Sequence, residues 1–363
     1  MSSDSDMTAI APETCIGEIP GTVRIRNASE KDRSAWNEFV DAHPHATNYH
    51  RWQWKQVIER SFGWPTYYLL AERDGRIAGV VPIVWQKSVA FGSFMTSLPF
   101  FSRGGIIAEN RQTGTALFDY AVELAKQRNA KYFQLRHTEP LALGLKSTRD
   151  KITLVRPVGS PDEMMAGLDT KMRTNIRRSL KSGLEIEFGH EDLLSDFYRI
   201  FAIRMRELGT PVYSERFFAE ILRAFPNESF ICRVLHQGKP VSASFLTGYR
   251  DRLEANWSSS LDEFSSLKPN VFMYWKILEF AAKKNYTTFD FGRSTVGSGT
   301  HHFKLKWHTK EEGLIWEYWA TVSGKPNDLR QNSSKFNLAV ILWKRIPLAV
   351  TRAIGPKISR CLP

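Results

Sequence analysis

The sequence is poor in cysteine and has no long apolar run. Its three cysteines, Cys15, Cys232 and Cys361, lie far apart and show none of the spacings typical of metal ligands. So few cysteines favour a reducing compartment. No segment approaches the roughly 20 consecutive apolar residues that a membrane-spanning helix needs, and the acidic, polar first residues do not form a secretory signal. We therefore expect a cytoplasmic protein that binds no metal.

Acidic residues are missing from two stretches of the chain. The whole sequence carries 50 Lys and Arg against 38 Asp and Glu, a formal charge of +12. Residues 170–184 hold five cations and residues 329–363 hold seven, with no acid in either stretch. The remainder is net neutral, which argues against a uniformly basic nucleic-acid coat. We expect two local anion-binding features and no DNA partner.

The length and an internal repeat indicate two domains. A chain of 363 residues with 42% hydrophobic and 24% charged residues is typical of a soluble protein with more than one core. The order hairpin, helix, strand occurs twice, first as ERDGRIAG…KYFQLR and then as LHQGKPVS…TTFDFG. This predicts two similar α/β domains with mixed sheets. The predicted division is a flexible tail, a first domain, a second domain and a basic amphipathic tail, at residues 1–21, 22–158, 159–325 and 326–363.

Three segments carry a family likeness: KMRTNIRRSLKSGLEIE, ELGTPVYSERFF and KPNVFMYWKILEFAAKKNYTTFDFGRSTVGSGTHHFKLKWH. Together they resemble the FemAB group of peptidyl/aminoacyl transferases, in the branch associated with PEP-CTERM and exosortase exopolysaccharide loci. The likeness covers roughly residues 23–322 and is most specific over 269–307. It implies two tandem GNAT-like acyltransferase domains. It also implies transfer of an aminoacyl group from a charged tRNA to an amine on a peptidoglycan precursor.

The motif Phe303-Lys304-Leu305-Lys306-Trp307-His308 supplies the first catalytic candidates. Acyl transfer builds negative charge on the carbonyl oxygen, and a positioned cation there lowers the barrier by about 3 kcal/mol. The resemblance assigns this role to Lys304, with Phe303 packed beside it. A solvent-facing lysine is the alternative, and Lys306 would then be its equal as a substrate-binding group. The family commonly has glycine where this chain has His308, which puts the turn geometry in question because glycine tolerates a positive φ far better.

A second candidate segment is the strand end formed by Asp290, Gly292, Arg293 and Ser294. Ligands of open α/β sheets bind beyond the carboxyl ends of strands. Gly292 would allow a sharp turn there, and Arg293 and Ser294 would reach the cleft. Asp290 would orient Arg293 or accept a proton from an attacking amine; capping a neighbouring turn is the alternative. A kinase-like Asp-Phe-Gly is excluded because the chain has no glycine-rich loop or catalytic-loop motif.

A basic helix and a tryptophan complete the predicted substrate-binding residues. Arg173 and Arg177 share one helix face, and Arg178 neighbours them. This cluster suits a phosphate, a diphosphate or an RNA backbone; the alternative is a solvated surface helix. Glu254, Asn256 and Trp257 could line the cleft between the domains, but strand alternation places Glu254 and Asn256 on one face and Trp257 on the other, so not all of them can. Trp257 would line the cleft or, as we favour, pack in the core.

The first domain contains a short pattern that matters only if the donor is an acyl-coenzyme A. Arg111, Gly114 and Ala116 fit the loop with which GNAT enzymes hold a pyrophosphate at a helix start. An ordinary capped helix start explains the pattern equally well. We expect no tightly bound cofactor, and the donor would be an aminoacyl-tRNA or an acyl-CoA.

The basic tail at 330–363 combines apolar residues, a tryptophan and cations. This composition is typical of a helix on an anionic membrane surface; docking onto the second domain and a disordered tail are the alternatives. We expect an acyltransferase acting on an amine or hydroxyl of an anionic or lipid-linked saccharide precursor of the cell envelope or exopolysaccharide. An acyl-CoA-dependent N-acyltransferase and a non-catalytic membrane-associated adaptor are the competing hypotheses. The expected location is the cytoplasm, peripheral at the inner face of the membrane.

Overall fold

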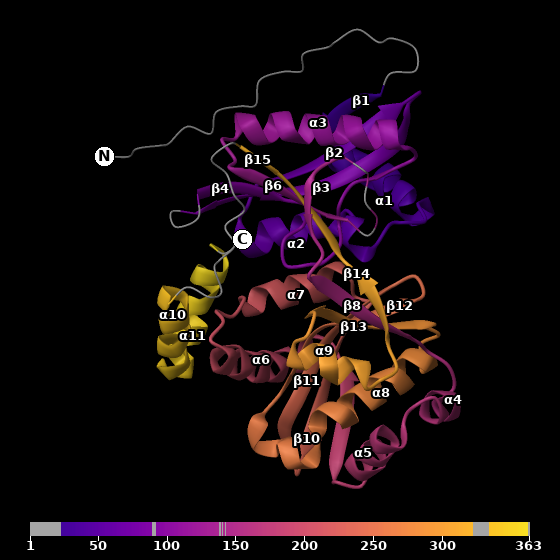
Figure 1. Ribbon diagram of the computed structural model, residues 1–363, viewed down its shortest axis with the longest axis vertical. Coiled ribbons are helices and arrows are strands. Elements are labelled where there is room, and N and C mark those ends of the chain that lie inside the picture. Colours follow the sequence, from indigo (N-terminus) through magenta and orange to yellow (C-terminus); the bar gives the residue numbers. More distant parts are fainter. Residues whose placement is uncertain are drawn as a thin grey trace.

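The computed structural model describes residues 23–321 and 334–361, apart from 89–91, 138, 140 and 142. The predicted flexible tail at 1–21 lies outside the described residues, as do 322–333 of the C-terminal region. The described chain forms two halves, each with one mixed sheet and flanking helices (Figure 1).

The first half is built on a sheet in the order β1-β2-β3-β4-β6-β15-β7, with β5 paired to β3. Its strands are β1 (Arg24–Asn27), β2 (Thr66–Arg73), β3 (Arg76–Ser88), β4 (Gly92–Thr96), β5 (Ile107–Ala108), β6 (Tyr132–His137), β7 (Lys146–Thr148) and β15 (Ile315–Ala320). Its helices are α1 (Arg33–Ala42), α2 (Gln53–Phe62) and α3 (Arg111–Gln127), with short 3-10 turns η1 (Glu30–Asp32) and η2 (Asn48–His50). Asp74 and Gly75 both have positive φ, which confirms the predicted tight hairpin between β2 and β3.

The second half is built on a sheet in the order β14-β8-β13-β12-β11-β10-β9. Its strands are β8 (Lys151–Pro157), β9 (Leu184–Gly189), β10 (Ser229–His236), β11 (Lys239–Tyr249), β12 (Arg252–Ser260), β13 (Thr288–Thr295) and β14 (Lys310–Gly313). Its helices are α4 (Pro161–Ala166), α5 (Thr170–Leu180), α6 (Leu194–Leu208), α7 (Glu215–Ala224), α8 (Pro269–Lys283) and α9 (Gly299–Leu305), with η3 (Glu191–Leu193) and η4 (Asp262–Leu267).

The two sheets have the same plan, which confirms the predicted repeat and the mixed α/β class. In each, four antiparallel strands are followed by one parallel neighbour: β4 with β6, and β12 with β13. Both parallel pairings are short. The pairing of β12 with β13 ends at Glu254 and Asp290, and the strands then diverge.

Two strands lie in the opposite sheet from the one that the sequence division implies. A boundary at 158/159 would place β8 in the first half and β15 in the second. In the structure β8 pairs with β13 and β14, whereas β15 pairs with β6 and β7. The short β7–β8 and β14–β15 connections each cross from one sheet to the other, so each sheet is completed by a strand from the other part of the sequence.

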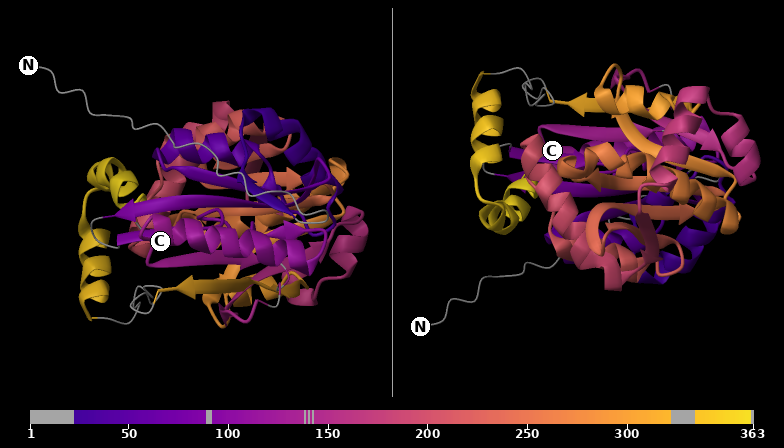
Figure 2. Two further views of the ribbon diagram at one scale, coloured as in Figure 1. Left: turned by 90° about the horizontal axis from the view of Figure 1, so that it is seen from above. Right: turned by 90° about the horizontal axis from the view of Figure 1, so that it is seen from below.

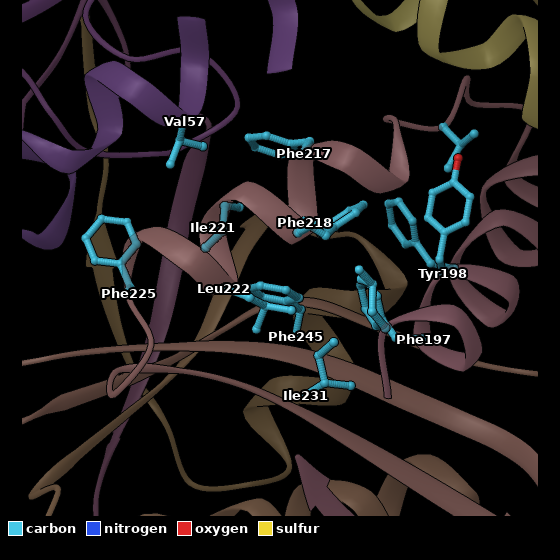
Figure 3. Close-up of a cluster of buried hydrophobic side chains, with 14 of the residues drawn as sticks. Val57, Phe197, Tyr198, Phe217, Phe218, Ile221, Leu222, Phe225, Ile231 and Phe245 are labelled. Atoms are coloured by element: carbon cyan, nitrogen blue, oxygen red, sulfur yellow. The ribbon is translucent and has the colours of Figure 1, made fainter. Parts of the chain in front are cut away.

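A shared aromatic cluster fills the space between the halves. Trp54 of α2 lies 4.9 Å from Phe225, the residue that follows α7, measured between ring centroids. Figure 3 shows the α7 side chains between Val57 of α2 and Phe245 of the second sheet. Together with the crossing strands, this buried contact makes the two halves one packed unit, and it fixes the geometry of any site formed between them.

The turn after α9 keeps a left-handed backbone although its residue is not glycine. His308 has φ 52°, and the buried Trp307 precedes it. A side chain at such a φ costs roughly 1 kcal/mol. We expect His308→Gly to raise the free energy of unfolding by about 1 kcal/mol in urea denaturation, because the strain is removed.

The matched control is His302→Gly, inside the preceding helix α9. His302 is exposed and helical, so glycine there should lower stability by about 1 kcal/mol. Equal destabilisation by both substitutions would show that the left-handed φ of His308 carries no strain.

The C-terminal region folds back as two helices, α10 (Ser334–Arg345) and α11 (Leu348–Ser359). Both contact α6 of the second half. Within the described residues, no helix is long and apolar enough to cross a membrane.

Candidate active site between the two halves

A group of charged side chains lies where the second sheet faces the first half. Glu254, Asp290 and Glu312 come from β12, β13 and β14, which are neighbours or near neighbours in that sheet. The first half contributes Tyr49 from η2 and Arg103 from the loop after β4. The exchange of strands described above brings these segments to one place.

Asp290 is the buried centre of this group. It accepts hydrogen bonds from the Gly292 backbone N–H at 2.8 Å and from the Thr153 hydroxyl. It also pairs with Arg103 and Arg252, each at 3.2 Å. The sequence suggested that Asp290 orients Arg293, but in the structure it holds these two other arginines. With both oxygens so engaged, the geometry suits positioning rather than proton transfer.

Arg103 and Arg252 extend the network to Glu312. Arg103 lies 3.1 Å from Glu312, and Arg252 lies 3.0 Å from it. The buried guanidinium group of Arg103, from the first half, thus contacts both Asp290 and Glu312 of the second half. Arg103 and Asp290 are buried, and removing one partner of a buried ion pair strongly destabilises a protein. This pair therefore holds the two walls of the site together.

Glu254, near the start of β12, belongs to a separate series of side-chain hydrogen bonds. The Tyr49 hydroxyl donates to Glu254 at 2.7 Å, and the Asn256 amide donates to that hydroxyl at 2.7 Å. Thr247 in turn donates to the Asn256 oxygen at 2.7 Å. Burial, together with the nearby charge of Asp290, raises the pKa of Glu254 to about 7. A carboxyl group that titrates near neutral pH is suited to general acid–base chemistry.

A cavity of about 270 Å³ opens onto these groups. Residues 44–49 and Arg103 line it from the first half, and residues 249–252 with Thr247, Glu254 and Glu312 line it from the second. Charged and aromatic side chains therefore face the same space. This is the arrangement expected for a polar small-molecule site between two packed units.

Lys304 lies at the point where β12 and β13 diverge. Its ammonium group donates to the carbonyl oxygens of Gly292 at 2.8 Å and Arg293 at 3.1 Å, and the side chain is buried. Burial lowers the pKa of Lys304 to about 8, although Asp290 and Glu254 lie close enough to oppose this shift. A desolvated cation at this position can stabilise charge that develops on a carbonyl oxygen.

Gly292 is required for that arrangement. Its φ is 76°, and a Cβ atom there would lie only 2.6 Å from the Ala255 carbonyl oxygen on the neighbouring strand. Glycine alone allows this backbone to approach β12 so closely while its own carbonyl faces Lys304. The sequence predicted that the strand ends in a sharp turn at Gly292, but β13 continues to Thr295, and Gly292 instead lies at an irregularity in its pairing with β8.

Four other predicted site residues have different environments. The Arg293 guanidinium lies 5.2 Å from the Trp316 ring. Ser294 is buried, and its hydroxyl has no hydrogen-bond partner among the described residues. Phe303 packs against Tyr274, with 5.7 Å between ring centroids. Lys306 is exposed at the end of α9, away from the two carbonyl groups that hold Lys304.

Trp257 belongs to the aromatic cluster between the halves. Its ring lies 5.1 Å from Phe218 and 5.8 Å from Phe101. It is absent from the cavity lining, whereas Glu254 is part of it. The structure therefore places Trp257 in the packing position that strand alternation favoured.

The basic helix forms a second hollow of about 500 Å³ on α5. Arg177, Arg178 and Lys181 line it together with the segment before α8. Arg173 instead contacts Thr170 and the Ala166 carbonyl at the start of α5. In Figure 1, α5 lies at the end of the second half that is distant from the first half. The arginines are thus separate from the cavity between the halves.

The pattern at Arg111, Gly114 and Ala116 occupies the first turns of α3. The Asn110 side chain caps the helix by accepting from the Thr113 backbone N–H at 2.9 Å. Gly114 is buried, and a Cβ there would press on Leu141. The geometry is that of a capped, packed helix start.

His301, near Lys304, is held by contacts within its own segment of the chain. His301 Nδ1 accepts from the Gly297 backbone N–H at 3.0 Å, and its Nε2 faces Glu311 at 2.8 Å. Among the described residues there is no group of three or more His, Cys, Asp or Glu side chains that could hold a metal ion.

Sequence reasoning considered Glu254 for the cleft without choosing it as a site residue, and it did not consider Tyr49 or Arg103. Tyr49 and Glu254 are 205 residues apart, and no motif marks either of them. Alternation along the strand did place Glu254 on the face opposite Trp257, which was the one available signal.

Comparisons with known proteins agree with this architecture. The model of the family described as "Acetyltransferase (GNAT) domain" matches residues 170–305. The lipid II:glycine glycyltransferase of Staphylococcus aureus is 24% identical over 189 residues, which is 46% of this chain and 44% of the relative. The match thus spans less than half of that enzyme.

Solved structures extend the likeness to both halves. The crystal structure of FemX has a TM-score of 0.65 at 17% identity and covers 81% of this chain and 96% of its own. A tandem GNAT protein from the clavulanic acid biosynthesis pathway has a TM-score of 0.55 at 10% identity, covering 85% and 100%. The fold is that of tandem GNAT proteins, and residues 170–305 match a GNAT acyltransferase domain.

Proposed function

We propose that the protein is a GNAT-type acyltransferase that moves an aminoacyl or acyl group onto an amine or hydroxyl of a cell-envelope precursor. The buried ammonium group of Lys304, at the divergence of β12 and β13, is the observation that carries this proposal. The GNAT domain match and the glycyltransferase relative support an acyltransferase enzyme over a non-catalytic adaptor.

In the proposed reaction the donor and the acceptor occupy two different places. The acyl carbonyl of the donor lies at the divergence, and the acceptor lies in the cavity beside Glu254. The acceptor nitrogen bonds to the carbonyl carbon, and Lys304 stabilises the resulting oxyanion. Glu254 takes the proton that the nitrogen loses. When the bond to the donor oxygen breaks, that proton passes to the leaving oxygen, so no covalent intermediate on the enzyme is needed.

The donor is proposed to be an aminoacyl-tRNA. The hollow on α5 offers three cations to a phosphate backbone, and two of them, Arg177 and Arg178, are one helix position apart. The capped and packed start of α3 gives the acyl-CoA alternative no comparable support. The acceptor is proposed to be a lipid-linked saccharide. Its assignment to an exopolysaccharide rests on the resemblance of the three quoted segments alone.

Calorimetric titration separates the two donors. We expect acetyl-CoA to give no binding heat, whereas a non-hydrolysable aminoacyl-RNA should bind with an affinity that falls as salt rises. Replacing Arg177, Arg178 and Lys181 by alanine should reduce the slope of log affinity against log salt by about 2, because three contacts to single-stranded phosphates are lost.

The control removes three lysines elsewhere, Lys87, Lys126 and Lys239, all exposed. This variant should keep the original slope. Binding of acetyl-CoA that survives the α5 substitutions would instead favour the acyl-CoA-dependent enzyme.

The proposed place of action is the cytoplasmic face of the membrane, because a lipid-linked acceptor is held there. The chain would associate peripherally with that surface. The cations of the C-terminal region support this location.

A further inference from the structure

The helices α10 and α11 are joined by a short turn at Pro347 and lie at one side of the molecule (Figures 1 and 2). In Figure 2 the pair stands at the edge of the protein beside the second half, and α6 is the helix that it contacts. The face turned toward α6 and the face turned outward differ sharply in composition.

The inner face is packed against the second half. Val340 lies against Gly209, which has no side chain to obstruct it, and Trp343 is buried. On α11, Gly355 lies against Val212 in the same way. These contacts fix the orientation of the pair, so its outer face is a defined surface of the folded protein.

The outer face of α10 carries an apolar stripe. Leu338, Ile341 and Leu342 are 56%, 49% and 54% exposed and follow the spacing i, i+3, i+4. Val350 and Ile358 on α11 are also exposed. These five residues are half of the large exposed apolar side chains of the described chain, although the two helices are a small part of it. Such clustering marks an interaction surface.

Cations without acids accompany the stripe on the same two helices. Lys344, Arg345, Lys357 and Arg360 are exposed and have no carboxylate within ion-pair distance among the described residues, while Arg352 lies 4.0 Å from Glu215. The sequence from 329 to 363 contains no acid at all. Two copies of this surface would repel each other, whereas a layer of anionic headgroups over an apolar interior complements both the cations and the stripe.

We propose that the outer face of the α10–α11 pair is a docking surface for an anionic lipid membrane. Leu338, Ile341 and Leu342 enter the boundary between headgroups and acyl chains, and the Lys and Arg side chains of the same two helices contact lipid phosphates. The proposal takes its purpose from the proposed function, since it would hold the enzyme near a lipid-linked acceptor. Its test measures lipid binding alone, so the transferase hypothesis and the docking hypothesis fail separately.

The full chain is tested by flotation with two kinds of vesicle, phosphatidylglycerol mixed with phosphatidylcholine and phosphatidylcholine alone. We expect binding to the anionic vesicles to exceed binding to the neutral ones by about tenfold or more, and to weaken at high salt. The double variant Leu338→Asp/Leu342→Asp should lose this binding with an unchanged circular dichroism spectrum, because both side chains are exposed.

Two matched variants decide whether the location of the surface matters. Leu180→Asp/Val296→Asp places two acids at exposed apolar positions elsewhere and should keep full binding. Removing three cations from α5, with Arg177, Arg178 and Lys181 changed to alanine, should keep it as well. Changing Lys344, Arg345 and Lys357 to alanine should abolish binding to the anionic vesicles. If Leu338→Asp/Leu342→Asp fails to fold, this alanine variant takes its place in the test.

Equal loss in the α5 variant would overturn the proposal, since general positive charge would then explain the binding. Full vesicle binding by the Leu338→Asp/Leu342→Asp variant would overturn it too. If light scattering also showed that the wild-type chain is a dimer and this variant a monomer, the stripe would be a contact between two copies.

Discussion

Replacing Lys304 by methionine is expected to lower kcat by about 100- to 1,000-fold while KM changes little. The reason is that the ammonium group acts on the oxyanion and not on the bound ground state. Methionine keeps the length and apolar stem of the buried side chain, so the fold should persist. Arginine keeps the charge but presents a larger planar group to the carbonyls of Gly292 and Arg293, and should restore little of the rate. The measurement is single-turnover transfer of a labelled aminoacyl group.

Lys306 supplies the control for this prediction. It lies two residues further along, is exposed, and has the same charge. Lys306→Met should retain near wild-type turnover. Should the two methionine variants transfer the label equally well, the role of Lys304 in stabilising the oxyanion would be lost, and with it the main support for the transferase hypothesis.

The residues around Lys304 show which parts of a site can be predicted from one sequence. Gly292 and Lys304 lie within one stretch of chain, so a motif can contain both, and their hydrogen bond spans twelve residues. The β2–β3 hairpin and the order of hairpin, helix and strand are local in the same sense. Alternation of apolar residues and turn chemistry fix such elements before the rest of the chain is placed.

The exchanged strands and the ion network could not be predicted in this way. Whether β8 pairs with β6 or with β13 depends on partners far away in the sequence, and its own apolar pattern fits either sheet. Arg103 meets Glu312 across 209 residues, and nothing near Arg103 marks it as a buried cation. Such contacts follow only from the assembled fold. The sequence therefore predicted site residues on β13, such as Asp290, but not Arg103, which binds Asp290 from the first half.

His308 departs from the family pattern, but this departure leaves the backbone conformation unchanged. The family likeness placed glycine there, and the chain keeps the left-handed φ of 52° with histidine. Packing of the buried Trp307 and the hydrogen bonds of α9 hold that turn. Tertiary contacts thus override a local preference of about 1 kcal/mol.

Replacing Glu254 by glutamine is expected to lower the rate of transfer by about 100-fold or more, because the group that accepts the proton of the acceptor is removed. Its pKa is raised to about 7, so the wild-type carboxyl group becomes a competent base as pH rises through 7. Lys304, whose pKa is lowered to about 8, loses its proton as pH rises through 8. The wild-type rate should therefore pass through a narrow maximum between these values, and Glu254→Gln should lack the acidic limb.

Tyr49→Phe tests the same assignment without touching the carboxyl group. The hydrogen bond from Tyr49 favours the charged form and lowers the pKa of Glu254, so its loss should move the acidic limb toward higher pH. Glu123→Gln, at an exposed position on α3, should leave the whole profile unchanged. An acidic limb that persists in Glu254→Gln, or that stays in place in Tyr49→Phe, would assign that ionisation to the substrate or to another group. The attacking amine would then lose its proton without Glu254.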